Sequence, residues 1–363
     1  MSKHVFSRAL VSACMLCAVA PAAHAATYAY VANADSESIS VFRLDRADGA
    51  LAAVQTVAVG GTVMPLALSP DHHRLYAGLR SAPYRVVSFA VNPIDGHLID
   101  LGNAPLAESM AYLSTDATGR YLFGASYGGN LVSVNPIAAN GVAGGPQQII
   151  RTGPMAHAIR SAPDNRHVFA SVLGDDVWLR FAFDPATGAL TQDAAPAYRL
   201  PSQSGPRHFQ FSSDRRFTYL IDELDGKLHV LAFDARHDTV KPVQTVSIVP
   251  AGFTGKPWGA DLHLTPDGRY LYASERTSST LATYRVARGT GTLMRIGTTA
   301  TPAQPRGFGI DPAGGYLLAV GQLSTQMTVY RIDRKTGGLR ALGDYPVGKN
   351  PNWVEIVDFD GAH

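Results

Sequence analysis

A cation and a carboxylate frame one apolar stretch of this 363-residue chain. In the segment GPRHFQFSSDRRFTYLIDELDG, which runs from Gly205 to Gly226, Arg207 stands near the start and Glu223 near the end. A guanidinium can hold a carboxylate, a phosphate or a developing oxyanion, and a carboxylate can accept a proton from an attacking water. The two side chains can act together only if the fold brings both ends of the segment to one place.

Two kinds of turn recur along the chain and indicate how such a segment is positioned. The first kind follows a short alternating apolar segment, such as LHVLAF, at intervals of roughly 50 residues, as expected for a strand entering a hairpin. Its seven copies begin at Asp45, Asn92, Asn135, Asp184, Asp234, Ala287 and Asp333. The second kind, six copies of a Pro/Asp/Gly turn between strand-like segments as in LTPDGRYLYASER, alternates with the first.

Repeats of this length, each with about four strands, predict an all-β fold, the seven-bladed β-propeller. Residues 26–363 divided by seven give about 48 residues per blade, which suits a single propeller domain. The segment TYAYVANADSESISVFRL resembles the last three strands of a blade, and NPNWVEIVDF resembles a first strand. We therefore expect the C-terminal strand to complete the N-terminal blade and close the ring. A pair of β-sandwiches is the alternative, which seven evenly spaced copies disfavour.

Counting sequence positions from the turn residue of each repeat predicts which side chains lie at the channel. In a propeller blade the first strand lines the central channel and the second runs antiparallel to it, so the start of the first strand meets the end of the second. Arg207 lies seven residues before the turn residue Asp214, and Glu223 lies nine residues after it. The same offsets in other repeats select His157, Arg306, Arg276 and Arg80. We expect these side chains at one rim of the channel.

Four further residues near these positions are predicted to line the channel wall and contact the substrate, namely His208, Trp258, Asp261 and His263. For any one arginine at a strand end, pairing with backbone carbonyls is the alternative role. Several buried arginines around one carboxylate are costly unless an anionic ligand completes the charge balance. Glu223 or His157 could activate a water, while Arg207 and Arg276 bind an anionic group.

Other chemistries find little support in the sequence. The stretch GASYG matches G-x-S-x-G, but another strand-like segment follows where a nucleophile elbow needs a helix, so Ser126 is not expected to be a nucleophile. No metal-ligand spacing is evident, and GTGTLM lacks the third glycine of a dinucleotide fingerprint. We therefore expect no metal and no cofactor.

The first 25 residues have the features of a signal peptide. Two cations, Lys3 and Arg8, precede the apolar run ALVSACMLCAVA, and AHA at 23–25 fits a cleavage site. The run is too short to span a bilayer, so we expect cleavage, no membrane span and a monomer that is periplasmic or secreted; a retained anchor is the alternative. Cleavage removes both cysteines and takes the formal net charge from +2 to 0, since the segment holds two cations and no acid. No nucleic-acid partner is expected.

Several stretches resemble the motifs of the seven-bladed lactonase family, which includes bacterial 6-phosphogluconolactonases of propeller type and fungal carboxy-muconate lactonizing enzymes. They are GPRHFQF, DEL, WGADLHLTPDGRYLYASERT and QPRGFGID, and the similarity extends from TYAYVAN to GKNPNWVEIV. The resemblance implies metal-independent opening or closing of a lactone ring. It places the proposed active-site residues of the family on His157, Arg207, Glu223 and Arg276.

The sequence departs from the family pattern at Tyr112, where the bacterial gluconolactonases often have a histidine. Because a pentose-phosphate intermediate is cytoplasmic, export would favour an unphosphorylated sugar lactone or another carboxylated lactone over the phosphorylated one. The expected function is hydrolysis of a small lactone, with a lactonizing isomerase as a variant of that activity. The alternatives are an exported propeller that only binds a small anion or a partner protein, and an envelope structural protein.

Overall fold

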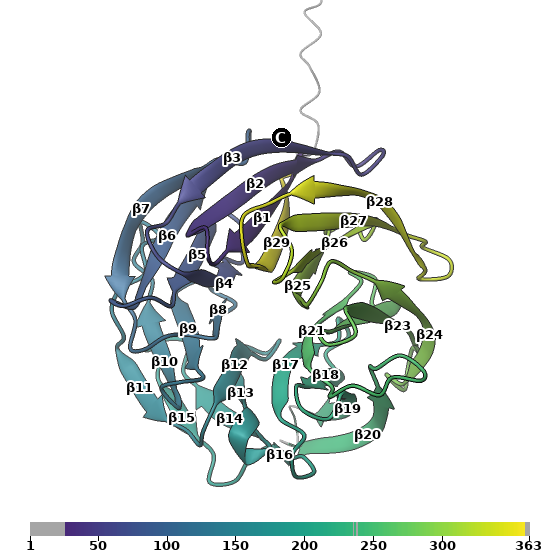
Figure 1. The fold of residues 1–363 in the computed structure, drawn as a ribbon. Helices are drawn as coiled ribbons and strands as arrows, with labels where there is room; N and C mark the ends of the chain where they lie inside the picture. The colour runs from purple at the N-terminus through teal and green to yellow at the C-terminus, as the bar shows by residue number, and fades with distance from the viewer. Residues whose placement is uncertain (1–25, 235, 237–238, 360–363) are drawn as a thin grey trace, which may run out of the picture.

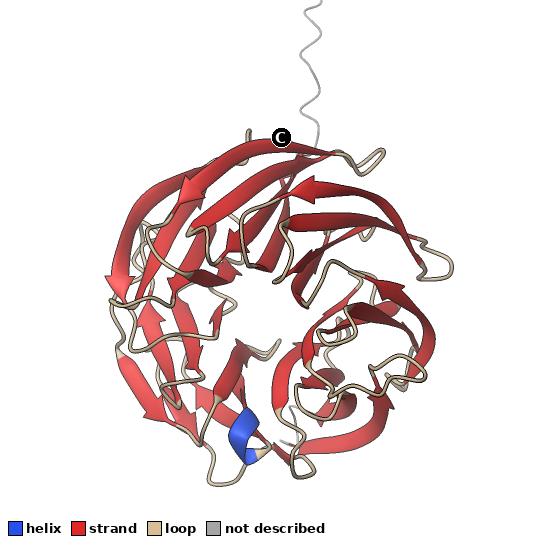
Figure 2. Cartoon of the chain, viewed as in Figure 1, coloured by secondary structure: helices blue, strands red, loops and turns tan. Residues whose placement is uncertain are grey.

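The computed structural model describes residues 26–359 except 235, 237 and 238. In this range 29 strands form seven antiparallel sheets around a central axis (Figure 1). Within the same range the helical content is one 3-10 turn, η1 (Leu173–Asp175), drawn in blue in Figure 2. The prediction of an all-β, seven-bladed propeller is confirmed. The predicted signal peptide, 1–25, lies outside the described residues.

Seven innermost strands surround the axis, one from each blade, and each contacts the next around the whole ring. They are β4 (Val63–Leu68), β8 (Tyr112–Thr115), β12 (Ala156–Ser161), β17 (Pro206–Phe211), β21 (Gly259–Leu264), β25 (Pro305–Ile310) and β29 (Pro351–Phe359). The second strands are β1 (Ala26–Asn33), β5 (Arg74–Leu79), β9 (Tyr121–Ser126), β13 (His167–Val172), β18 (Phe217–Asp222), β22 (Tyr270–Glu275) and β26 (Tyr316–Gly321).

The third and fourth strands form the outer part of each blade. The third strands are β2 (Ser38–Leu44), β6 (Arg85–Val91), β10 (Leu131–Pro136), β14 (Val177–Phe183), β19 (Lys227–Asp234), β23 (Thr280–Val286) and β27 (Gln326–Ile332). The fourth are β3 (Leu51–Ala58), β7 (Leu98–Pro105), β11 (Gln148–Arg151), β15 (Leu190–Gln192), β20 (Thr239–Ser247), β24 (Leu293–Ala300) and β28 (Leu339–Pro346). The short β16 (Tyr198–Arg199) pairs with β14 beside β15.

The two ends of the described chain share one blade, as the sequence predicted. Strand β29 pairs antiparallel with β1, from Ala26 opposite Phe359 onward, in the order β29-β1-β2-β3. The Thr27 hydroxyl donates a hydrogen bond of 2.5 Å to the Asp358 carboxylate. Because this pairing joins residues more than 300 positions apart, it closes the ring of blades.

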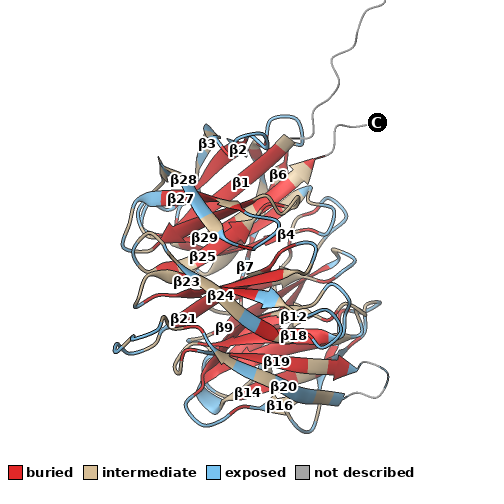
Figure 3. Cartoon of the chain, turned by 90° about the vertical axis from the view of Figure 1, so that its right-hand side faces the viewer, coloured by how far each residue is buried: buried red, intermediate tan, exposed pale blue. Residues whose placement is uncertain are grey.

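Burial follows the position of a strand within its blade. The second strands are packed on both faces against neighbouring blades, so β13 and β22 are nearly continuous runs of buried residues. The outer strands alternate, and β3 and β20 expose every second residue or more. The edge-on view shows buried residues in the inner layers and exposed residues in loops and outer strands (Figure 3).

The recurring turn motif has a structural cause. Gly96 adopts a positive φ of 76°, and a Cβ at this position would overlap the ring of Tyr28 from the neighbouring blade. The Tyr28 hydroxyl donates to the Ile94 carbonyl at 2.6 Å, and the Tyr30 hydroxyl donates to the Gly96 carbonyl at 3.0 Å. Only glycine meets both the dihedral and the steric requirement here. Tyrosine-to-turn contacts of this kind recur between blades and explain the spacing seen in the sequence.

Candidate functional site

The hairpin formed by β17 and β18 brings Arg207 and Glu223 together. Pro206 pairs with Asp222, so the residues that follow each of them lie at the same end of the hairpin. Arg207 Nε donates to Glu223 Oε2 at 2.9 Å, and a terminal nitrogen of Arg207 also donates to the Ala260 carbonyl. The two charges therefore meet at one end of this hairpin, where the sequence analysis places them.

A second arginine and an indole complete the surroundings of the Glu223 carboxylate. A terminal nitrogen of Arg276 lies 3.0 Å from Glu223 Oε2 and also donates to the Gly259 carbonyl at 3.0 Å. The Arg276 guanidinium stacks 3.8 Å from the centre of the Trp258 ring, and Trp258 Nε1 donates to Glu223 Oε1 at 3.2 Å. The Glu223 side chain is 12% exposed, so solvent reaches it while its position stays fixed.

His157 and an unpredicted tyrosine lie beside this carboxylate. His157 Nε2 is 3.9 Å from Glu223 Oε2, and the buried His157 Nδ1 has no hydrogen-bond partner among the described residues. The Tyr127 ring packs edge-on against the His157 ring at 5.9 Å. Tyr127 follows β9 directly, as Glu223 follows β18. The two turns have the same length, but Asp116 stands at the first turn position, where the other hairpin has Ser212, so counting from the turn Asp missed Tyr127. Aligning the turn at Gly119 instead would have found it.

Two more arginines predicted from the repeats face the same rim. Arg306 is partly buried, its Nε has no partner among the described residues, and its pKa is lowered by burial and by the positive charges of Arg207 and Arg276. Arg80 Nε donates to the Ser109 hydroxyl at 3.0 Å, and its pKa is lowered by burial and by the charge of Arg207. The rim therefore brings four guanidiniums close to one another, and two of them, Arg207 and Arg276, contact the Glu223 carboxylate. This arrangement favours a negatively charged ligand or transition state.

The protonation states of the two candidate bases follow from these neighbours. Burial opposes ionisation of Glu223, but the charges of Arg207 and Arg276 outweigh it and lower its pKa. Burial, followed by the charge of Arg207, holds the pKa of His157 well below its usual value. At neutral pH Glu223 is therefore an anion and His157 a neutral imidazole, and both can accept a proton.

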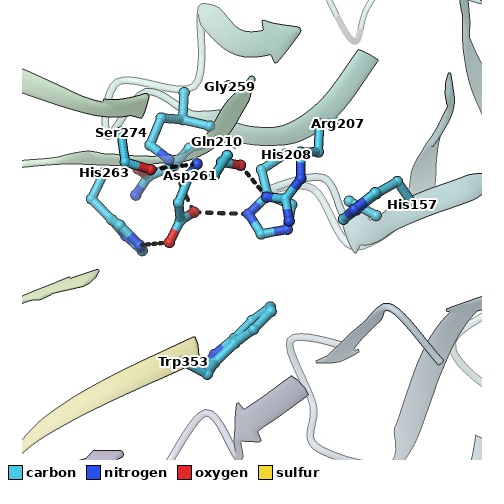
Figure 4. Close-up of polar contacts among 12 residues, drawn as sticks. His157, Arg207, His208, Gln210, Gly259, Asp261, His263, Ser274 and Trp353 are labelled. Atoms are coloured by element: carbon cyan, nitrogen blue, oxygen red, sulfur yellow. Dashed lines mark hydrogen bonds and ion pairs between the residues drawn. The ribbon is translucent and has the colours of Figure 1, made fainter. Parts of the chain in front are cut away.

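Three of the four predicted wall residues, His208, Asp261 and His263, form a hydrogen-bonded row that extends from the rim into the channel (Figure 4). The His208 ring lies 5.3 Å from the His157 ring, and His208 Nδ1 contacts Asp261 Oδ1 at 2.8 Å. Asp261 Oδ2 contacts His263 Nε2 at 3.1 Å. Burial and the charge of Arg207 lower the pKa of His208 to about 3. Of the predicted wall residues, Trp258 contacts Glu223 directly, His208 adjoins His157, and His263 lies further along the channel.

The GASYG stretch around Ser126 has a structural explanation. Ser126 ends β9 and its hydroxyl donates to the Ser109 carbonyl at 2.8 Å, and the chain continues through a turn into β10 rather than a helix. Over the described ranges, no group of three or more His, Cys, Asp or Glu side chains could hold a metal ion. Over these ranges, too, no helix is long and apolar enough to cross a membrane.

Comparison with known proteins identifies closely similar chains. The family model Lactonase, 7-bladed beta-propeller, matches residues 23–356. The 6-phosphogluconolactonase of Serratia proteamaculans is 42% identical over 328 residues, covering 90% of this chain and 98% of the relative. The 6-phosphogluconolactonase of Pectobacterium carotovorum is 40% identical over 331 residues, covering 91% and 98%. The structure of the periplasmic gluconolactonase of Pseudomonas aeruginosa aligns with a TM-score of 0.83 at 29% identity, covering 91% of this chain and 99% of that one.

Proposed function

This chain belongs to the seven-bladed β-propeller lactonase family, and from this premise we propose that its rim site hydrolyses a small sugar lactone. The observation that supports the site is the Glu223 carboxylate, held by Arg207 and Arg276 beside the neutral His157. Hydrolysis of a lactone needs a base for the attacking water and cations for the oxyanion that forms at the carbonyl. The rim supplies both within one cluster.

We propose that His157 takes a proton from the water while the water oxygen bonds to the lactone carbonyl carbon. The carbonyl oxygen becomes an oxyanion, which Arg276 and Arg306 stabilise. The bond between that carbon and the ring oxygen then breaks, and the ring oxygen receives the proton from His157. The products are a hydroxyl group and a carboxylic acid, which releases its proton to solvent. Glu223 orients the arginines and could serve as the base in place of His157.

The relatives and the predicted signal peptide support the proposed substrate class. Relatives at 40–42% identity are named 6-phosphogluconolactonase, and the Pseudomonas protein is named a periplasmic gluconolactonase. If residues 1–25 direct export, the chain meets sugar lactones that carry no phosphate. We propose a monomer that is periplasmic or secreted and acts on an unphosphorylated aldonolactone. The arginines then serve the oxyanion and the product carboxylate.

The test is acid release at constant pH from glucono-δ-lactone and from its phosphorylated form, above the spontaneous rate. We expect turnover of the unphosphorylated lactone by the wild type and its loss in Arg276→Met. The exposed Arg340, on the outer strand β28, provides the matched control Arg340→Met, which should retain full turnover. A folded wild-type protein inert to both lactones would overturn the proposed function. If gluconate then still raised its melting temperature, the non-catalytic binding propeller would be supported instead.

A further inference from the structure

A separate cavity of about 320 Å³ lies further along the same channel. Its lining comes from six of the seven inner strands, and none of the four arginines of the rim takes part. Arg160, Gln210 and His263 of the lining each follow a rim position by three residues, namely His157, Arg207 and Ala260. At 3.2–3.4 Å per residue, this places the cavity roughly 10 Å deeper than the rim, toward the opposite face.

The cavity contains a cation without a carboxylate partner. Among the described residues no Asp or Glu lies within ion-pair distance of Arg160. Burial raises the pKa of Tyr112, and the nearby charge of Arg160 opposes that rise. His263, whose side chain is 32% exposed, supplies a second donor to the lining of the same cavity. Burial opposes protonation of His263, but the Asp261 carboxylate raises its pKa. Two basic groups therefore face one small volume.

Acceptor groups and an aromatic wall complete the lining. Glu355 accepts a hydrogen bond of 2.8 Å from Trp353 Nε1, and burial raises the pKa of its carboxyl group. The Trp353 ring is held edge-on against Tyr112 at 5.4 Å. In Figure 4 this ring faces the row of His263, Asp261 and His208, and its centre lies 5.6 Å from that of the His208 ring. The cavity is thus a slot between a flat apolar surface and a row of polar groups.

We propose that this cavity binds a small hydroxylated carboxylate, of the size of a six-carbon sugar acid. The ligand carboxylate pairs with Arg160 and His263, its hydroxyl groups bond to Glu355 and to the Gln210 amide, and its carbon chain packs on Trp353. A volume of about 320 Å³ is at the lower end of the range for small-molecule sites. The inference does not rest on the proposed reaction, because none of the groups assigned to proton transfer or oxyanion binding lines the cavity, although His208, Asp261 and His263, predicted from the sequence to contact the substrate, do line it.

Tryptophan fluorescence can separate the two sites. The described chain has Trp178 in the core, Trp258 at the rim and Trp353 in the cavity. In the Trp258→Phe protein the accessible reporter is Trp353, and we expect gluconate to change its fluorescence saturably. Adding Arg160→Met should raise Kd at least about tenfold, because a charge-assisted hydrogen bond is lost. Arg160→Lys should recover part of the affinity.

Three comparisons make the experiment decisive. Arg340→Met in the same background should leave Kd unchanged, and sorbitol, which lacks the carboxylate, should bind much more weakly than gluconate. The inference is overturned if Trp258→Phe shows no saturable response, if Arg160→Met leaves Kd unchanged, or if the response survives Trp353→Phe and requires Glu223. Lactone turnover by the Arg160→Met protein is measured in parallel. Retained turnover with lost gluconate binding supports the cavity site, and lost turnover in Arg276→Met with retained binding shows that the sites are independent.

Discussion

The rim and the deeper cavity use the same residue types in different ways. At the rim the charges contact one another, and a single carboxylate, Glu223, holds Arg207 and Arg276 in fixed positions. In the cavity Arg160 and Glu355 line an open volume and form no ion pair with each other. A prearranged cluster suits charge that develops on one atom, whereas groups spread around a volume suit a whole molecule. The difference indicates that one channel can hold a reaction site and a binding site.

The largest expected effect concerns the rim arginines. Arg276→Met removes a donor to the developing oxyanion, so kcat/KM for lactone should fall about 10²- to 10³-fold. Gluconate binding in the cavity should be unchanged, as read from Trp353 fluorescence. The measurement is initial-rate acid release for wild type, Arg276→Met and Arg340→Met. An equal loss in the Arg340→Met control would place the effect outside the rim.

The next effect concerns stability. Glu223→Gln leaves Arg207 and Arg276, whose side chains are 0% and 2% exposed, without their carboxylate. Breaking such a buried pair should lower the free energy of unfolding by about 3 kcal/mol. Urea denaturation measures the change, and Glu355→Gln in the cavity is the comparison, since no guanidinium is paired there. Equal destabilisation by Glu223→Gln and Glu355→Gln would contradict the view that the rim charges are paired with one another while the cavity charges are not.

The two histidines that contact Asp261 should contribute to stability with opposite pH dependence. Burial and the charge of Arg207 lower the pKa of His208 to about 3, so acidification below its unfolded pKa of about 6.5 costs stability. The pKa of His263 is raised, so its contribution is present below about pH 6.5 and is lost as pH rises through its folded pKa. His208→Gln should therefore flatten the acid side of the stability profile. His263→Gln should reduce stability more at pH 6 than at pH 9.

Urea denaturation at several values between pH 4 and pH 9 measures how the free energy of unfolding of each variant depends on pH. Parallel profiles for His208→Gln and His263→Gln would contradict the assignment of opposite shifts. Because Asp261 contacts the rings of both His208 and His263, Asp261→Asn should change the pH dependence of stability on both the acid and the alkaline side. This variant therefore checks that the two histidines act through Asp261.

The smallest effect is expected from the aromatic neighbour of Arg276. Trp258→Phe keeps a ring under the guanidinium but removes the hydrogen bond of 3.2 Å from Nε1 to Glu223. A cost of about 1 kcal/mol corresponds to a loss of roughly fivefold in kcat/KM. Glu355→Gln in the cavity should change kcat/KM by less than about twofold, since it touches no rim residue. A larger loss in Glu355→Gln than in Trp258→Phe would reverse the proposed division of roles.

The repeats allowed most of the fold to be predicted from the sequence. Turn glycines such as Gly96 and strand tyrosines such as Tyr28 recur because the local backbone and the contact between blades require them. The closing of the ring was also visible, since the chain starts with three strands of a blade and ends with one. Arg207, Glu223, Arg276 and His157 could be grouped because strand register converts sequence offset into position on a face.

The remaining features depend on distances that register alone does not give. Tyr127 was missed because the Asp of its turn stands two residues earlier than in the hairpin of Glu223, and the depth of His263 along the channel was not distinguished from that of His208. The cavity that joins Arg160, Glu355 and Trp353 was not predicted. These residues come from non-adjacent blades, so only the closed ring brings them face to face.

The sequence thus determined the blades and the rim charges through local, repeated constraints. The tertiary structure decided which side chains share a volume, because that depends on how seven blades pack around one axis.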